Sequence, residues 1–164
     1  MTIQEGTTRM RKWDKRFLRI ARNEIASWSK DPNEQVGCVI VSPDRRQFSP
    51  GYNGFPAGIK DSEDRLKDKE LKNALSVHAE LNAILNSRTD LTGWTLYVTK
   101  APCSKCALAI IQAGIIRVVC PPIREDSRWA EDQKLARDLI TEAGLVYYPF
   151  DLDTLEEDKR ALNF

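Results

Sequence analysis

The stretch WTLYVTKAPCSKCALAIIQAGIIRVVC, residues Trp94–Cys120, decides the fold because it carries a strand, a helix and a second strand in succession. Trp94–Thr99 predicts a strand from its β-branched and aromatic residues. Pro102–Ala113 predicts a helix, since proline suits the first helical turn and Gly114 follows the end. Ile115–Cys120 predicts the next strand. Strands that alternate with helices in this way indicate parallel pairing, with helices packed on the sheet.

Strands and helices continue to alternate on both sides of this unit. The expected strands outside it are Gln35–Ser42, Gln47–Tyr52 and Leu145–Tyr148. The expected helices outside it are Trp13–Trp28, Val77–Leu85 and Arg128–Ala143. Together they predict an α/β fold, a three-layer αβα sandwich with a five-stranded mixed sheet. Gly51–Gly58 is expected to be a loop, and the charge-dense Asp61–Lys72 a solvated helix or a mobile excursion.

Length and composition fit a single globular domain. The chain has 164 residues, of which 41% are hydrophobic and 30% are charged, and this suffices for a core without disulfides. We expect one domain over residues 1–164, with its core at about 12–149 and a short helical or loosely held tail at 150–164. The net charge of +1 gives no general attraction to nucleic acid or to a membrane surface. The apolar runs are too short to cross a bilayer and the first residues lack a signal core, which predicts a cytoplasmic protein.

Two short motifs carry metal-binding residues, HAE at 78–80 and PCSKC at 102–106. Both fall at the start of an expected helix, and Cys103 and Cys106, three residues apart, share one helix face. One imidazole and two thiolates are the protein ligands of a catalytic zinc site that keeps one place for water. We therefore expect His78, Cys103 and Cys106 to hold one Zn²⁺ ion. Glu80 is expected to act as general acid and base without binding the metal.

A structural zinc site is the alternative interpretation of these motifs. A lone C-x-x-C pair is often structural, and a lone histidine is often an ordinary core residue. A structural zinc ion requires a fourth protein ligand, and only Cys38 or Cys120 could supply another sulfur. Both lie in apolar strands, where a small thiol is expected to pack as a hydrophobic group. This favours a catalytic site over a non-catalytic zinc-binding module.

Four stretches extend the pattern beyond the metal motifs. They are SKDPNEQVGCVIV (29–41), GYNGFPAG (51–58), HAELNAI (78–84) and APCSKCALAIIQAGI (101–115). From about Ile20 to Tyr148 the chain resembles the deoxycytidylate (dCMP) deaminases, which have the cytidine-deaminase-like fold. The zinc motif alone is shared by deaminases of nucleosides, bases, tRNA and riboflavin precursors, whereas the combination of stretches is more specific to the dCMP branch.

The resemblance implies a hydrolase that converts dCMP to dUMP and ammonia in pyrimidine deoxynucleotide metabolism. Glu80 would take a proton from the zinc-bound water, deliver it to N3 of cytosine and then protonate the leaving amino group. Backbone amides near Ala79 and Cys103 would position the base. Asn53 resembles the family asparagine that contacts the nucleotide, although an Asn-Gly pair also suits a turn.

The resemblance also suggests where the phosphate and effectors would bind. Ser29 and Lys30 offer a hydroxyl and a cation that suit a 5′-phosphate, or they form the ordinary solvated end of a helix. Members of the family are often activated by dCTP with Mg²⁺ and inhibited by dTTP. These effectors would bind near Gly54, Gly58 and the charged stretch that follows. The branch often forms homo-oligomers, hexamers among them.

Two departures from the family pattern matter. Some phage members carry a second, structural zinc before the catalytic histidine, but no Cys or His lies between Cys38 and His78 here, so we expect one zinc ion. A family tyrosine that packs near the base is missing from PPIREDSRW (121–129). Trp129 could form an aromatic wall in its place, or Arg124 could act there, while Trp129 could also be a core residue.

Deamination of tRNA or of single-stranded nucleic acid is the main enzymatic alternative. The basic and aromatic segment Arg9–Arg22 could form a polynucleotide track, but the solvated face of an amphipathic helix is the favoured explanation. The SKDPN and GYNGFPAG stretches favour a mononucleotide, so nucleic acid is not expected as a partner. Deamination of dCTP beside dCMP stays open.

Overall fold

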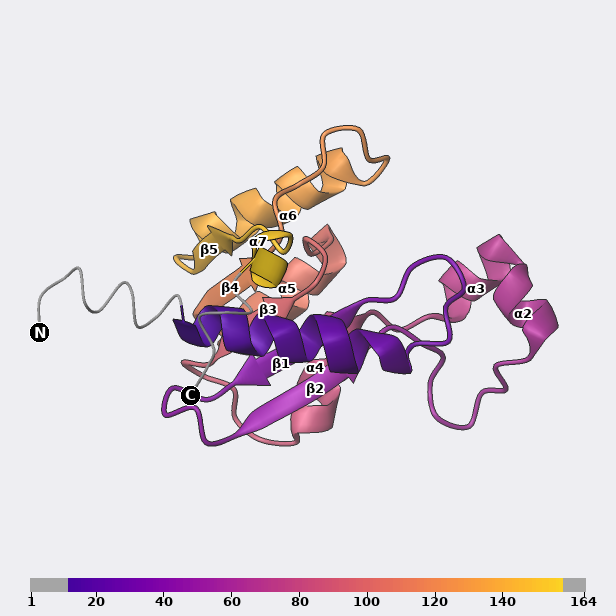
Figure 1. Ribbon diagram of the computed structural model, residues 1–164, viewed down its shortest axis with the longest axis horizontal. Helices are drawn as coiled ribbons and strands as arrows, with labels where there is room; N and C mark the ends of the chain where they lie inside the picture. The colour runs from indigo at the N-terminus through magenta and orange to yellow at the C-terminus, as the bar shows by residue number, and fades with distance from the viewer. Residues whose placement is uncertain (1–11, 158–164) are drawn as a thin grey trace, which may run out of the picture.

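Five strands form one mixed sheet at the centre of the structure, a computed structural model that describes residues 12–157 (Figure 1). The strands are β1 (Gly37–Val41), β2 (Phe48–Tyr52), β3 (Thr95–Val98), β4 (Arg117–Cys120) and β5 (Val146–Pro149). Their order across the sheet is β2-β1-β3-β4-β5. The predicted five-stranded mixed sheet is confirmed; β1 to β4 are one to three residues shorter than expected, and β5 keeps its expected length but begins one residue later.

Strand direction differs from the simple expectation of parallel pairing. β3, β4 and β5 pair in parallel as predicted, but β1 pairs antiparallel with both β2 and β3. β2 turns back along β1 as a hairpin, and the chain then crosses to the other side of β1 before β3 begins. β3 therefore runs in the direction of β2, and the antiparallel pairing of β1 with both strands is what makes the sheet mixed, as predicted.

The helices lie close to their predicted positions. Residues 12–19 are helical and continue into a π-helical stretch, η1 (Ile20–Ile25), and a 3₁₀ turn, η2 (Ala26–Trp28). The other helices are α2 (Glu63–Lys67), α3 (Lys69–Leu75), α4 (Ala79–Ser87), α5 (Ser104–Gln112), α6 (Ala130–Glu142) and α7 (Thr154–Glu157). Figure 1 shows α2 and α3 projecting together at one end of the molecule. None of the helices within residues 12–157 is long and apolar enough to cross a membrane.

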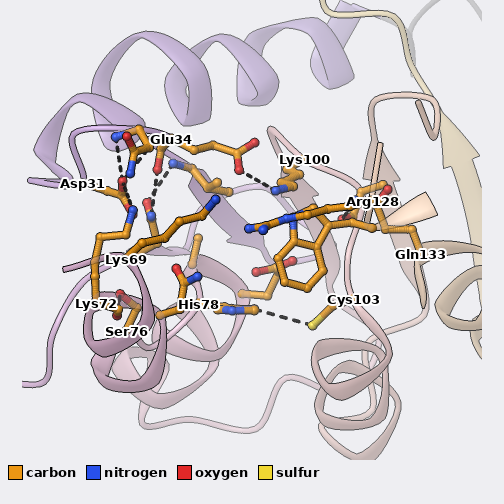
Figure 2. Close-up of a pocket in the computed structure, with 18 residues that line it drawn as sticks. Asp31, Glu34, Lys69, Lys72, Ser76, His78, Lys100, Cys103, Arg128 and Gln133 are labelled. Carbon is orange, nitrogen blue, oxygen red and sulfur yellow. Dashed lines mark hydrogen bonds and ion pairs between the residues drawn. The ribbon is translucent and has the colours of Figure 1, made fainter. Parts of the chain in front are cut away.

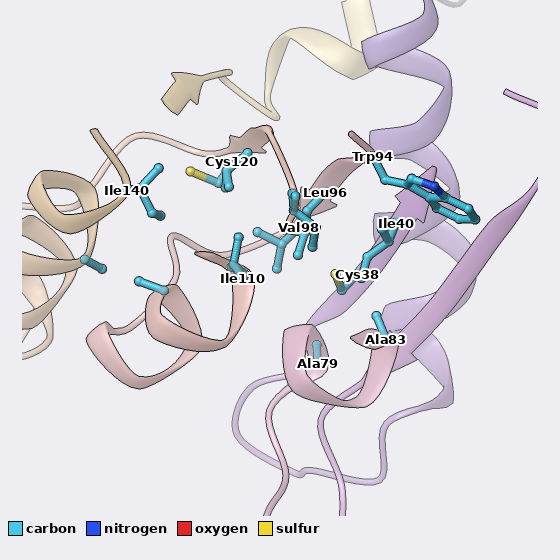
Figure 3. Close-up of a cluster of buried hydrophobic side chains, with 14 of the residues drawn as sticks. Cys38, Ile40, Ala79, Ala83, Trp94, Leu96, Val98, Ile110, Cys120 and Ile140 are labelled. Atoms are coloured by element: carbon cyan, nitrogen blue, oxygen red, sulfur yellow. The ribbon is translucent and has the colours of Figure 1, made fainter. Parts of the chain in front are cut away.

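Side chains that alternate along the strands build one hydrophobic core on each face of the sheet. Toward α4, α5 and α6 the strands direct Cys38, Ile40, Leu96, Val98, Val118 and Cys120 (Figure 3). Toward the first helix they direct Val39, Val41, Tyr97 and Val119. Helices therefore cover both faces, which confirms the three-layer αβα sandwich. Phe150 and Leu155, in the segment predicted as a tail, are buried in the second core, and residues beyond 157 lie outside the described part of the chain.

Close packing of α4 on β2 sets the position of the site. A Cβ atom at Gly51 would lie 2.2 Å from the Ala79 carbonyl oxygen and 2.3 Å from the Ala83 nitrogen. Only glycine lets the α4 backbone come this near. The N-terminal end of α4, which carries the HAE motif, is thereby brought beside the sheet.

Candidate active site

His78 and the two cysteines of PCSKC come together at the N-terminal ends of two helices. His78 is the N-cap of α4 and Cys103 is the N-cap of α5, with Cys106 in the first turn of α5. The His78 Nδ1 atom lies 3.5 Å from the Cys103 sulfur and 3.4 Å from the Cys106 sulfur. Both motifs therefore begin a helix, as the sequence predicts, and they meet at one point.

The spacing of these three atoms fits a zinc ion. Nitrogen and sulfur ligands at about 2.1 and 2.3 Å from an ion, at the tetrahedral angle, lie about 3.6 Å apart, which is close to the observed 3.5 and 3.4 Å. Across residues 12–157, the group of side chains placed to hold a metal consists of His78, Cys103 and Cys106. Cys38 and Cys120 are fully buried in the hydrophobic core instead (Figure 3). The donor set is therefore that of a catalytic zinc site.

The two cysteines of the group have opposite pKa shifts. The Cys106 thiol and then the His78 ring hydrogen-bond to the Cys103 sulfur, and these contacts lower the pKa of Cys103 to about 4. The pKa of Cys106 is raised, because its thiol interacts with the Cys103 sulfur and is buried. Zinc binds cysteine as the thiolate, so metal binding releases the thiol protons that the pair carries.

Glu80 is a buried carboxylic acid two residues after His78. Its side chain is 5% exposed and lines the same cavity as His78 and Cys103. Burial raises the pKa of Glu80, because the charged form loses its hydration. A carboxyl whose pKa is shifted toward neutrality suits a general acid and base.

A cavity of about 260 Å³ lies against these groups (Figure 2). Of the residues predicted to contact substrate, it is lined by Asn53, Ala79 and Trp129. The Asn53 side chain accepts a hydrogen bond from the Val36 N–H and donates one to the Glu34 carbonyl. Asn53 thus fixes the local backbone as well as bordering the cavity, and ligand contact by Asn53 stays a prediction.

Other predicted binding residues lie away from this cavity. Ser29 is 3% exposed and donates its hydroxyl to the Asn53 carbonyl. Lys30 forms an exposed ion pair with Asp61 and lines a separate, smaller pocket together with Gly54. Gly58 lies at an exposed turn with a φ of 88°. Arg124 pairs with Asp126 and does not line the cavity either.

Cationic side chains at the cavity mouth are the main feature that the sequence analysis missed. Lys69, Lys100 and Arg128 line the cavity, and in Figure 2 Lys69 and Arg128 extend toward one another from opposite sides. Lys100 directly precedes the APC motif and Arg128 directly precedes Trp129. Their position next to predicted site residues could therefore have indicated that they lie near the site. Lys69 lies in a charge-dense stretch that has the same pattern as any solvated helix.

A buried ion pair fixes the helix that carries Lys69. Lys72, whose side chain is 4% exposed, lies 2.8 Å from the Asp31 carboxylate. Asp31 also accepts hydrogen bonds from the Asn33 and Glu34 N–H groups. The Asp61–Lys72 stretch is therefore not a merely solvated excursion, because α3 is attached to the loop that follows the first helix.

The fold and the site together define a class of protein, a metal-dependent hydrolase of the αβα type with its metal ligands at two helix N-termini. Residues 11–121 match the family described as the cytidine and deoxycytidylate deaminase zinc-binding region. The chain is 44% identical over 147 residues to an uncharacterized deaminase in the luxG 3′ region of Aliivibrio fischeri, covering 88% of this chain and 98% of that protein. It is 37% identical over 147 residues to the deoxycytidylate deaminase of Homo sapiens, covering 84% of this chain and 79% of that protein.

A solved structure supports the fold independently. The crystal structure of the dCMP deaminase from cyanophage S-TIM5 in apo form superposes with a TM-score of 0.66 at 21% identity, over 85% of this chain and 98% of that chain. The chain belongs to the cytidine and deoxycytidylate deaminase zinc-binding family. The family resemblance is thereby confirmed, and zinc is the metal that the His-Cys-Cys group fits.

Proposed function

We propose that this protein hydrolyses dCMP to dUMP and ammonia. The observation that carries the proposal is that two residues of the metal-binding group, His78 and Cys103, border one cavity with the buried Glu80, and that Lys69, Lys100 and Arg128 line the same cavity. The human relative, which shares 37% identity over 84% of the chain, is named deoxycytidylate deaminase. The same cavity therefore offers groups that can react with the base and groups that can bind the phosphate.

Glu80 moves the protons in the proposed reaction. His78, Cys103 and Cys106 hold the zinc ion, which when bound lowers the pKa of water and so supplies a hydroxide nucleophile near neutral pH. Glu80 accepts a proton from the attacking water and passes it to N3 of the cytosine ring, which makes C4 more electrophilic. The hydroxide oxygen adds to C4, Glu80 takes the proton of the resulting C4 hydroxyl and gives it to the C4 amino group, and the C4–N bond breaks to release ammonia and leave the C4 carbonyl of dUMP.

Cations at the cavity mouth favour a nucleotide over a nucleoside. A phosphate monoester carries about −1.5 to −2 charges at pH 7, and its oxygens accept hydrogen bonds from lysine and arginine. We assign the 5′-phosphate to Lys69, Lys100 and Arg128, which line the cavity. Ser29 and Lys30, the candidates from the sequence, do not line this cavity.

Trp129 is assigned to the base. Its side chain is 41% exposed and borders the cavity, and the Arg128 guanidinium lies 4.8 Å from its ring centre. An aromatic ring that lines the same cavity as His78 and Cys103 offers a stacking surface to a planar base. Trp129 thereby takes the place of the tyrosine that the family pattern expects.

Ammonia release from several substrates tests the function directly. The zinc-loaded protein is assayed with dCMP, deoxycytidine, dCTP and tRNA under the same conditions. We expect dCMP to have the highest kcat/KM, with activity lost on chelation and restored by zinc. Turnover of tRNA without dCMP would instead support the nucleic-acid alternative. A zinc-loaded protein that is inert toward all four substrates would support a non-catalytic zinc-binding module.

Effector regulation is a further part of the proposal, and it rests on the family resemblance. Trp28 and Tyr52 line the smaller pocket that holds Lys30 and Gly54, and their rings suit a nucleotide base. We expect dCTP with Mg²⁺ to raise the rate at subsaturating dCMP and dTTP to lower it. Unchanged rates would remove regulation from the proposal. Light scattering of the same samples measures whether the chain forms the expected homo-oligomer.

A further inference from the structure

The first turn of α6 makes three hydrogen bonds to the loop that carries the metal-binding cysteines. Asp132 accepts from the Ser104 backbone N–H at 2.9 Å and from the Ser104 hydroxyl at 2.6 Å. The Gln133 side chain, 5% exposed, donates to the Ala101 carbonyl at 2.9 Å. Because Ala101 and Ser104 lie on either side of Cys103, α6 holds the loop both before and after this ligand.

These bonds act on the geometry of the two thiols. N–H groups in the first turn of a helix have no partner within that helix. In α5 the Cys106 N–H donates to the Cys103 sulfur at 3.5 Å, and the Ser104 N–H donates to Asp132. With Ser104 held at both its N–H and its hydroxyl, the backbone between the cysteines is restrained so that both sulfurs face His78.

Docking of α6 against the sheet depends on other residues. Ala136 and Ile140 of α6 are fully buried, at 0% exposure, in the core that also contains the inner face of α5. Asp132 is only partly buried, and each of its carboxylate oxygens accepts from Ser104. Loss of the Asp132 carboxylate should therefore disturb the cysteine loop more than the placement of the helix.

We propose that Asp132 is a positioning residue for the zinc ion, because through Ser104 it holds Cys103 and Cys106 in their ligand geometry. Gln133 supports the same loop on its other side. The inference rests on the zinc assignment of the proposed function but not on the identity of the substrate. Partners outside the ligands fix ligand orientation, and their removal typically weakens metal binding by about 10–100-fold.

Zinc affinity of the purified full chain, measured by competition with a chromophoric chelator, tests this without any substrate. Asp132→Ala should weaken zinc binding by about 10-fold or more. Asp132→Asn can still accept from the Ser104 N–H and donate to its hydroxyl, so it should bind zinc more tightly than Asp132→Ala. Glu131→Ala is the matched control, because this 89% exposed side chain lies in the same turn but pairs with Lys134. Its zinc affinity should equal that of the wild type.

Ser104→Ala provides an independent route, since it deletes only the hydroxyl. It should weaken zinc binding less than Asp132→Ala, and the double substitution should weaken it no further than Asp132→Ala alone, because the residues act together. If Asp132→Ala does not fold, the zinc affinity of Ser104→Ala tests the inference instead: weaker binding supports it, and wild-type binding contradicts it.

Thermal unfolding of the metal-free variants separates positioning from simple stability. Asp132→Ala and Ser104→Ala could each lower the unfolding temperature and still bind zinc with wild-type affinity. That result would overturn the role of Asp132 but would leave the proposed function intact. A wild-type chain that binds no zinc would overturn the proposed function together with it.

Discussion

Glu80 combines burial with a place in the metal-binding cavity, so it is the residue whose change should separate chemistry from metal binding. We expect Glu80→Gln to retain zinc, because the three ligands are untouched, and to lose about 10²–10⁴-fold in kcat, the usual contribution of a general acid and base. Zinc content by atomic absorption and ammonia release from dCMP measure the two effects. Glu70→Gln, at an exposed position on α3, is the control. Full activity in Glu80→Gln would contradict the assigned role.

The cations at the cavity mouth should matter only for phosphorylated substrates. A hydrogen bond to a charged group contributes about 1.5–3 kcal/mol, so Arg128→Ala and Lys69→Ala should each raise the KM for dCMP by about 10-fold or more. The kcat/KM for deoxycytidine should not change. Lys67→Ala is the control, because Lys67 pairs with Glu63 on α2 outside the cavity. Equal losses for both substrates would place these residues in base binding or in the fold instead.

Sequence reasoning found the metal-binding residues because their chemistry is local. His78, Cys103 and Cys106 lie in short motifs at helix starts. Such a motif can be recognised from its residue types and spacing, whatever the fold of the rest of the chain. Lys69 has no such signal, since a lysine in a charge-dense stretch is usually solvated. Only the tertiary structure brings it to the cavity that His78 lines. Asp132 escaped notice for the same reason, because its partner Ser104 lies 28 residues away in the chain.

At the scale of elements, the Asp31–Lys72 pair determines where α3 lies. Removing one partner of a buried pair leaves an uncompensated charge, so Asp31→Asn should lower the free energy of unfolding by about 3–5 kcal/mol. It should also raise the KM for dCMP, because α3 carries Lys69 to the cavity. Adding Lys72→Met to Asp31→Asn should restore most of the stability.

The exposed Lys30–Asp61 pair supplies the comparison for that experiment. Its side chains are 69% and 42% exposed, and exposed pairs contribute about 0–1 kcal/mol. Asp61→Asn should therefore change the free energy of unfolding by less than about 1 kcal/mol in the same urea titration. Equal effects of Asp31→Asn and Asp61→Asn would show that α3 does not depend on the buried pair.

The same pair should make part of the stability dependent on pH. Burial acts to raise the pKa of Asp31, but hydrogen bonds from Lys72 and from the Asn33 and Glu34 amides outweigh it, and the pKa is lowered in the folded protein. A carboxyl with a lowered folded pKa stabilises the fold above its unfolded pKa of about 3.9, and this stabilisation is lost as the pH falls through the folded value. The stability difference between the wild type and Lys72→Met should therefore hold from about pH 7 to 5 and shrink below about pH 4. A difference that persists undiminished at about pH 3 would argue against Asp31 as its source.

The elements themselves were predictable, whereas the direction of one strand was not. β1 has the same apolar run whether its neighbour is parallel or antiparallel, because it is buried on both faces. What decides the direction of β3 is the hairpin of β1 and β2 together with the crossing through α4, and these depend on the packing of α4 against Gly51. Local pattern therefore gave the order of strands and helices, but the sheet topology required long-range contacts.

At the scale of the whole molecule, the fold has two hydrophobic cores, and neither contains any of the three metal-binding side chains. The larger core lies under α4, α5 and α6, and the second lies under the first helix. A buried ion pair between Asp14 and Arg117, at 2.7 Å, also joins that helix to β4. Within residues 12–157, the metal-binding group is formed where the N-terminal ends of α4 and α5 meet. This arrangement differs from that of small zinc domains, in which metal binding supplies the folding energy.

Removal of zinc should consequently lower the melting temperature without unfolding the chain at 25 °C. A ligand that binds only the folded state adds about 2.7 kcal/mol when its free concentration is about 100 times the Kd. For a chain of this size, that free energy corresponds to a rise in Tm of roughly 5–11 °C. Calorimetry with buffered free zinc, and with a chelator, measures the shift, and far-ultraviolet circular dichroism at 25 °C reports whether the metal-free chain keeps its helices and strands. A Cys106→Ser variant, which lacks one ligand, should have nearly the same Tm with and without zinc. Loss of all secondary structure on chelation would mean that the two cores cannot hold the sheet by themselves, and the metal would then be part of the fold as well as of the site.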